Sequence, residues 1–193
     1  AMDIKELVKR NRSYRRFDQS EPMETPMLRE FVELARLSAS GANLQPLKFI
    51  ISSKQQRNEK IFDCLAWAGY LPEWDGPAEG ERPTGYIVVL GDTDISKSFT
   101  YDAGIAVQSM LLGAVEKGYG GCIFGSINRD KLRAGLGIEE KYEILLVVAL
   151  GRPAEQVMLE QVRKDGSIKY WRDEQGRHHV PKRSVDEIII ESY

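Results

Sequence analysis

Cysteine is scarce in this sequence, and its placement excludes several kinds of site. The 193 residues include two cysteines, Cys64 and Cys122, and both stand among apolar residues. They form no CxxC pair, so neither a cysteine-based zinc site nor a dithiol redox motif is predicted. Isolated thiols of this kind indicate buried, free side chains in a reducing compartment.

Long apolar runs are also missing. No uninterrupted stretch approaches the roughly 20 residues that a membrane-spanning helix needs, and no basic-then-apolar secretory signal opens the chain. We therefore expect a cytoplasmic protein with no membrane partner. The net charge of −2 gives no overall attraction to nucleic acid or to anionic lipid, so any basic function must be local.

Sequence fingerprints for nucleotides and metals are absent as well. Gly118-Tyr119-Gly120-Gly121 is not a dinucleotide fingerprint, because isoleucine stands at position 123, where the third glycine would fall. No Walker-type loop occurs. The adjacent His178 and His179 lack a carboxylate or cysteine at ligand spacing, so the sequence predicts a solvated loop pair and no metal site.

The composition that remains is ordinary for a globular protein. The length predicts one domain over residues 1–193. Asp3 with Glu6 predicts the start of a first helix, and Thr25 followed by Pro26 predicts the N-cap and first turn of a second. Apolar spacing and capping residues predict helices over 4–10, from 25 to about 38, 55–66 and 98–117. Apolar runs predict strands over 48–51, 85–91, 120–125 and 144–150.

The segment from Trp67 to Gly85 differs in composition from the predicted helices and strands. Three large aromatics, Trp67, Tyr70 and Trp74, are interleaved with prolines and acidic residues. Such a segment cannot be a regular helix or central strand throughout. Two interpretations stay open: a lid-like functional loop, since long loops are often functional, or a surface-packed loop with aromatic anchors.

Two further segments suggest contact with another element or another chain. The helix over 98–117 is rich in alanine and glycine, which suits either a dimer interface or a tightly buried central helix. The last ten residues, 184–193, carry Val185, Ile188, Ile189 and Ile190 with little of the chain left to bury them. We expect them to form a C-terminal arm.

The most informative short segment is Arg12-Ser13-Tyr14-Arg15. An arginine fork matches a phosphate dianion, and a neighbouring hydroxyl can bind another phosphate oxygen. The alternative is a solvated helix end in which arginines pair with Asp18 or Glu21. A basic arm for nucleic acid is disfavoured, because stacking aromatics are not interleaved with the cations.

In chain order, the distinctive segments resemble the nitroreductase family of flavin enzymes. They are Arg12–Phe17, Ser40-x-x-Asn43-x-Gln45-Pro46, Asp102–Gln108, Gly118–Gly121 and Pro181–Arg183. The resemblance implies an α+β fold, with a central, mostly antiparallel mixed sheet flanked by helices, and an intertwined homodimer with FMN at its interface. It also implies electron transfer from NAD(P)H through FMN to nitroaromatics, quinones or similar small acceptors. Reductive dehalogenation, substrate dehydrogenation and flavin binding without turnover remain alternatives.

The resemblance also implies roles for single residues. The FMN phosphate and ribityl chain would be held by Arg12, Ser13 and Arg15, joined by Lys182 or Arg183. A partner subunit would line the flavin edge with Ala39, Ser40, Gly41, Asn43 and Gln45. Gly120 and Gly121 would let the backbone approach the ring, and Trp67, Tyr70 and Trp74 would contact the substrate. No side chain is expected to be catalytic, because the flavin carries the chemistry.

The sequence departs from the family pattern at three positions. Asn11 replaces a common arginine, Ala39 a common proline and Leu47 a common aromatic residue. The first removes a potential phosphate contact, and the other two alter the pocket wall. The substrate preference of relatives therefore does not transfer to this chain.

Overall fold

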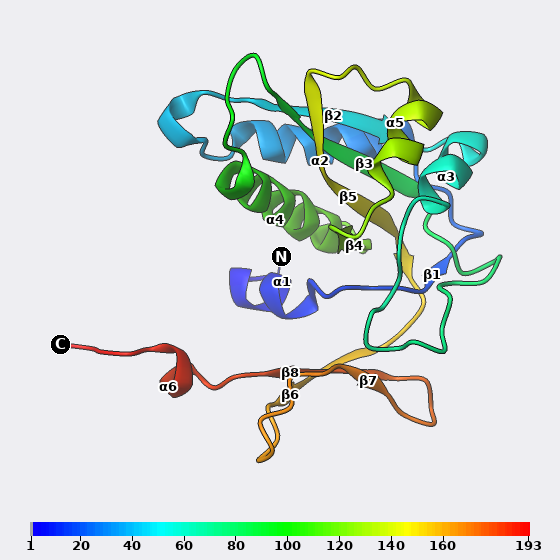
Figure 1. The fold of residues 1–193 in the computed structure, drawn as a ribbon. Coiled ribbons are helices and arrows are strands. Elements are labelled where there is room, and N and C mark those ends of the chain that lie inside the picture. The colour runs from blue at the N-terminus through cyan, green and yellow to red at the C-terminus, as the bar shows by residue number, and fades with distance from the viewer. Residues whose placement is uncertain (1) are drawn as a thin grey trace.

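A central sheet with helices on both faces organises the computed structural model, which describes residues 2–193 (Figure 1). Four of its strands run in the order β1-β5-β3-β2, and β4 also pairs with β5. Every pairing among these strands is antiparallel. The strands are β1 (Phe17–Asp18), β2 (Leu47–Ser52), β3 (Gly85–Asp92), β4 (Gly120–Phe124) and β5 (Tyr142–Pro153).

The two faces of the sheet are covered by different helices. α2 (Thr25–Leu37) and α4 (Thr100–Glu116) pack on one face, and α3 (Gln55–Phe62) and α5 (Arg129–Leu136) pack on the other. Side chains of β3 alternate between them, since Ile87 and Val89 meet α2 and α4 while Tyr86, Val88 and Leu90 face the opposite way. Burial on both faces explains why this strand is an unbroken apolar run.

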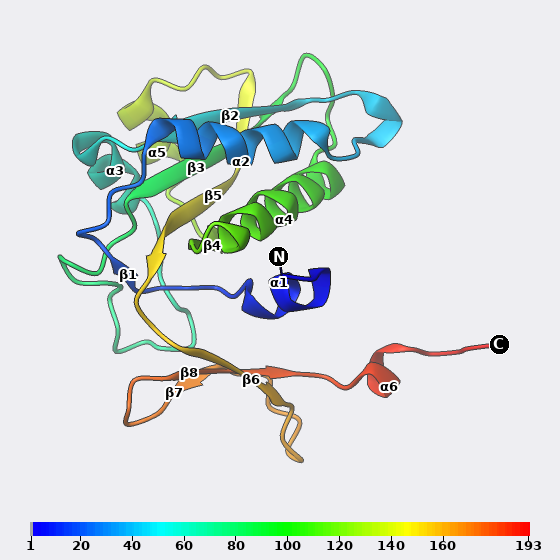
Figure 2. The same ribbon diagram turned by 180° about the vertical axis from the view of Figure 1, so that it is seen from behind.

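The remaining elements form a separate small layer. α1 (Ile4–Arg10) lies between α4 and a second sheet of order β6-β8-β7, a position that both views agree on (Figures 1 and 2). Its strands are β6 (Val157–Gln161), β7 (Trp171–Arg172) and β8 (His178–Lys182), and β6 runs parallel to β8. After the short helix α6 (Val185–Ile188), the C-terminal end projects away from the rest of the chain (Figure 2).

Most of the predicted elements are confirmed, with shifts at their ends. The first helix begins where predicted, and Asp3 accepts a hydrogen bond from the Glu6 amide (2.9 Å). The predicted cap of the second helix is wrong by one residue: Glu24 is the N-cap, and the Thr25 hydroxyl bonds to that of Ser53 (2.8 Å) instead. The third helix ends at Phe62 rather than at residue 66, because the following segment pairs with the strand-like stretch around Ile127.

The prediction that His178 and His179 form a solvated pair is wrong. Both side chains are buried in β8. His179 lies between two carboxylates, with Nε2 2.8 Å from Asp173 Oδ2 and Nδ1 against Glu160. These partners come from neighbouring strands and turns of the small sheet, so burial leaves the imidazole fully hydrogen-bonded.

Two other predictions concern the cysteines and membrane association. Cys64 and Cys122 are free and buried, as predicted, and burial raises the pKa of the Cys122 thiol to about 11. Neither thiol is therefore primed as a nucleophile. Within residues 2–193, no helix combines the length and the apolar character needed to cross a bilayer.

Candidate functional site

The N-terminal segment that follows α1 lies against the start of β4. Ser13 forms a parallel bridge with Gly121, and the Tyr14 amide donates to the Gly121 carbonyl at 3.0 Å. A Cβ atom on Gly120 would lie 2.4 Å from the Tyr14 ring, and one on Gly121 would lie 2.7 Å from the Ala149 carbonyl oxygen. Close packing therefore requires glycine at both positions, and it brings two predicted motifs together.

Arg12 and Ser13 retain the capacity to bind an anion at this junction. One terminal nitrogen of Arg12 donates to the Val8 carbonyl at 2.9 Å, while its Nε is buried without a hydrogen-bond partner among the described residues. Burial lowers the pKa of Arg12, but a guanidinium keeps its charge at any ordinary pH. Ser13 is exposed. A charged donor and an accessible hydroxyl thus stand side by side.

Arg15 points toward the small sheet. Its guanidinium lies over the Tyr170 ring, 4.5 Å from the centroid, and its Nη1 lies 3.1 Å from His178 Nε2. Burial, followed by the charge of Arg15, lowers the pKa of His178 to about 4. The imidazole is therefore neutral near pH 7, and Nε2 accepts because a guanidinium has only donors.

A second cluster surrounds the loop between α2 and β2. The Asp102 carboxylate, in the first turn of α4, accepts hydrogen bonds from the Ser40 hydroxyl and the Gly41 amide, the latter at 3.0 Å. The Ser40 hydroxyl oxygen also accepts from the Gln45 amide at 3.0 Å. Asp102 therefore holds the loop at both its start and, through Ser40, its end.

The backbone of this loop is strained. Ala42, Asn43 and Gln45 have φ values of 48°, 56° and 53°, in the left-handed region that residues other than glycine rarely occupy. Asparagine tolerates this conformation, whereas alanine and glutamine adopt it at a cost. Such strain concentrates at functional sites, where the surrounding structure enforces it.

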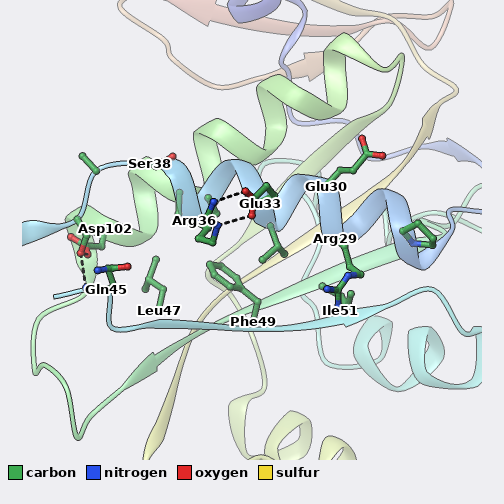
Figure 3. Close-up of a pocket in the computed structure, with 16 residues that line it drawn as sticks. Arg29, Glu30, Glu33, Arg36, Ser38, Gln45, Leu47, Phe49, Ile51 and Asp102 are labelled. Atoms are coloured by element: carbon green, nitrogen blue, oxygen red, sulfur yellow. Dashed lines mark hydrogen bonds and ion pairs between the residues drawn. The ribbon is translucent and has the colours of Figure 1, made fainter. Parts of the chain in front are cut away.

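The loop closes one end of a groove of about 1050 Å³ between α2 and β2. Figure 3 shows Leu47, Phe49 and Ile51 pointing from β2 into this groove, with Gln45 and Asp102 at its end. On its helical side, Arg36 binds Glu33 through two contacts of 2.6 Å. The groove is thus an apolar channel with a charged rim and a polar end.

The three predicted substrate residues contact other protein groups. Trp67 packs edge-on against Phe124, with ring centroids 4.6 Å apart. Trp74 lies beneath the guanidinium of Arg172 at 4.1 Å. Tyr70 is 46% exposed and packs against Tyr170, whose hydroxyl accepts from the Tyr70 amide at 3.2 Å. The loop is therefore anchored at three points.

The C-terminal cations occupy a different position from Arg15. Lys182 and Arg183 are exposed at the end of β8, and Arg183 lies 3.8 Å from Glu187. The contact between the two ends of the chain is made by His178 and Tyr170 instead. Neither residue was indicated by the sequence, because each acquires its role from a strand pairing that no local pattern reveals.

Asp102 was also missed as a site residue. Asp102 opens one of the segments on which the family resemblance rests, but its place in the first turn of a helix is also explained by the helix dipole, so no site role was assigned to it. Within residues 2–193, no group of three or more His, Cys, Asp or Glu side chains is arranged to hold a metal ion. The first cluster offers charged and polar donors to an anion, and the second places polar groups at the end of an apolar groove.

Comparison with known proteins identifies the family. The profile described as "Nitroreductase family" matches residues 8–74 and 83–152. The chain belongs to the nitroreductase family. The match includes the Arg12–Phe17 segment, the strained loop and the Gly120-Gly121 pair, and it ends before the small sheet.

Two solved structures share the nitroreductase fold over nearly the whole chain. A Desulfovibrio desulfuricans protein in complex with FMN has a TM-score of 0.72 at 21% identity, covering 100% of this chain and 98% of that one. A nitroreductase family protein from Streptococcus pneumoniae has a TM-score of 0.71 at 20% identity, covering 98% and 100%. The α+β fold expected from the sequence is thus confirmed.

A curated relative comes from Bacillus subtilis and bears the name "Putative NAD(P)H nitroreductase YodC". It is 24% identical over 184 residues, which cover 78% of this chain and 91% of the relative.

Proposed function

We propose that this nitroreductase-family protein is an FMN-dependent oxidoreductase that passes electrons from NAD(P)H to nitroaromatics, quinones or similar small acceptors. Family membership supports the reaction class. The FMN complex of the Desulfovibrio protein supports the cofactor, and the name of the Bacillus relative supports the electron donor. The observation that carries the proposal is the pairing of Ser13, which directly follows Arg12, with Gly121.

The first cluster fits a phosphate-bearing flavin. Arg12 has a buried Nε without a partner among the described residues, and Ser13 is accessible beside it. A phosphate dianion needs this kind of charge-assisted donor set. In the proposed site Arg12, Ser13 and Arg15 hold the phosphate and ribityl chain, and Lys182 or Arg183 adds a further positive charge.

When bound, FMN supplies the electron-transfer chemistry itself. The protein contributes binding, orientation and exclusion of water. Gly120 and Gly121 bring the backbone to the ring, while Trp67, Tyr70 and Trp74 form the wall on which an acceptor rests. Because no catalytic side chain is invoked, activity is expected to follow flavin occupancy.

The second cluster belongs in this proposal to a partner subunit. Ala39, Ser40, Gly41, Asn43 and Gln45 then line the flavin edge across a homodimer interface. The exposure of this strained loop in a single chain supports the arrangement, since Gly41 to Gln45 are all exposed. Leu44, at 52% exposure, is an apolar side chain that an interface would cover.

The C-terminal arm, residues 184–193, is proposed to lie in the α2–β2 groove of the partner. Ile188 and Ile190 are 63% and 96% exposed, and the arm projects from its own chain (Figure 1). β2 is an edge strand that pairs only with β3 among the described strands, and the groove beside it is apolar. Exposed isoleucines and an open strand edge are complementary surfaces.

Light scattering tests the dimer. The unaltered protein should have the mass of two chains, and the double variant Ile188→Ser with Ile190→Ser should dissociate at higher concentration. Ile168→Ser, an exposed isoleucine outside the arm, is the matched control and should leave the mass unchanged. A monomeric parent protein that binds FMN would contradict the shared site.

Flavin content and rapid kinetics test the activity. Purified protein should be yellow or become so with added FMN, and the released flavin should carry one phosphate. Stopped-flow mixing with NADH or NADPH should bleach the flavin, and menadione or a nitroaromatic should restore its colour. Bound flavin that neither nucleotide reduces would contradict the NAD(P)H step, and a protein that gains no flavin would contradict the whole proposal.

A further inference from the structure

Glu155 is a buried carboxylate with three protein contacts. It lies between β5 and β6, beyond the residues that the family profile matches, and its side chain is 2% exposed. Oε1 accepts hydrogen bonds from the amides of Arg15 (2.5 Å) and Arg16 (3.2 Å). Oε2 lies 3.5 Å from a terminal nitrogen of Arg172, which supplies the compensating charge.

These contacts fix one side of the Arg12–Phe17 segment. The Ala154 amide donates to the Arg16 carbonyl at 3.0 Å, and Phe17 pairs with Pro153. Two successive amides on one carboxylate oxygen, followed by a strand pairing, leave the backbone little freedom at residues 15–17.

The other side of the segment is fixed by β4. Tyr14 donates its amide hydrogen to Gly121, and Ser13 bridges to the same glycine. The backbone from Ser13 to Arg16 is therefore held between two anchors on opposite sides. Removing either anchor would loosen the backbone that carries Arg12, Ser13 and Arg15.

We propose that Glu155 is a positioning residue for phosphate recognition: it holds the Arg15 and Arg16 amides so that the Arg12–Arg15 donors converge on one phosphate group. This inference rests on the proposed function, because it needs an FMN phosphate at that segment. Glu155 itself touches neither cofactor nor substrate. Its effect is expected in the affinity for the phosphate group and not in the affinity for the flavin ring.

Two conservative variants separate the length of the Glu155 side chain from its negative charge. Glu155→Asp keeps the charge that Arg172 needs but shortens the side chain, so it cannot reach both amides. Glu155→Gln keeps the reach and a carbonyl acceptor but loses the charge. Dissociation constants for FMN and for riboflavin, which lacks the phosphate, are measured by flavin fluorescence for each variant.

The expected result is a change in the preference for FMN over riboflavin. Glu155→Asp should weaken FMN binding by about tenfold or more while riboflavin binding stays within about threefold. Glu155→Gln should retain most of the preference. A general structural defect would instead weaken both ligands together, and thermal melts establish that each variant is folded at the assay temperature.

Asp173→Asn is the matched control. Asp173 is also a carboxylate of the small sheet that accepts two amide hydrogen bonds, from Gln175 and Arg177, but none of its hydrogen bonds reaches the Arg12–Phe17 segment. The Asp173→Asn variant should have a lower melting temperature and an unchanged preference for FMN over riboflavin.

The inference is overturned if Glu155→Asp keeps the parent preference, if it loses both ligands equally, or if Asp173→Asn shifts the preference as much. An unaltered protein that binds riboflavin as tightly as FMN would refute the phosphate site of the proposed function, and this inference with it. That outcome is distinguishable because it is seen before any substitution is made.

Discussion

The Tyr170 ring lies beneath the Arg15 guanidinium at 4.5 Å, and its hydroxyl accepts a hydrogen bond from the Tyr70 amide at 3.2 Å. One side chain of the small sheet thus contacts both the N-terminal basic segment and the loop over residues 67–85. We therefore expect movement of that loop to be coupled to the environment of Arg15 through this residue.

Substitutions of Tyr170 should separate its two contacts. Tyr170→Phe removes only the hydroxyl, so amides near Tyr70 should exchange faster with solvent while FMN affinity stays unchanged. Tyr170→Leu also removes the ring face, and FMN binding should weaken by about 0.5–2 kcal/mol, the usual range for a cation–π contact. Hydrogen exchange by mass spectrometry and fluorescence titration measure the two effects. Equal exchange in Tyr170→Phe and the parent would contradict the coupling.

Removing both guanidiniums should have a larger effect on FMN. Each charge-assisted hydrogen bond contributes about 1.5–3 kcal/mol, so Arg12→Ala with Arg15→Ala should weaken FMN binding by about 3–6 kcal/mol. Arg57→Ala, an exposed arginine on α3, is the control and should bind FMN normally. Unchanged affinity in the double variant would remove both arginines from the site.

The strained loop predicts a stabilising substitution. Ala42 has φ 48°, where an L-residue is disfavoured by about 1–2 kcal/mol and glycine is not. Glycine adds about 0.5–1 kcal/mol of unfolded-state entropy, so Ala42→Gly should raise the free energy of unfolding by up to about 1.5 kcal/mol. Ala39→Gly, three residues away and without a positive φ, should lower it. Urea unfolding at one fixed protein concentration measures both, and a loss in Ala42→Gly would contradict the strain.

The two adjacent histidines should give opposite pH dependences of stability. The hydrogen bond that His179 donates to Asp173, together with its contact with Glu160, raises the pKa of His179 above its ordinary value near 6.5. Its stabilising contribution is therefore complete below about pH 6.5 and is lost as the pH rises through the folded-state pKa. Burial lowers the pKa of His178 to about 4, so the unfolded chain takes up that proton first, and stability falls from about pH 6.5 toward pH 4.

Thermal melts across this pH range test the pair. His179→Gln should remove the loss of stability on the alkaline side, and His178→Gln should remove part of the loss on the acid side. If both variants keep the parent profile, the two imidazoles do not govern it.

The sequence predicted the elements whose own residues determine them, such as β3 and α4. The glycine-bounded apolar run of β3 and the small-residue spacing of α4 correspond closely to the observed elements. α5 was not predicted, although Asn128 caps its start and Gly137 ends it with a φ of 66°. The asparagine and the glycine are local capping signals that the sequence itself carries.

The small sheet and much of the candidate site depend on pairings between distant residues. β7 has two residues, and β6 and β8 have five each, with polar side chains among the apolar ones, so their sequences give no clear strand pattern. Arg15 contacts His178 Nε2, Asp173 contacts His179 and Arg172 contacts Glu155, while His178 Nδ1 is buried without a hydrogen-bond partner among the described residues. No local pattern predicts these contacts. The sequence could indicate which residues are candidates for anion binding, but not which residues hold them in place.

The contact between Arg15 and His178 joins positions 163 residues apart along the chain. Glu155, which lies 140 positions beyond Arg15, binds the same segment. In the proposed site, cofactor binding through this segment therefore depends on residues distant in the sequence as well as on the arginines themselves. A protein clipped ahead of Glu155 would keep every arginine of the motif and still lack the groups that order them.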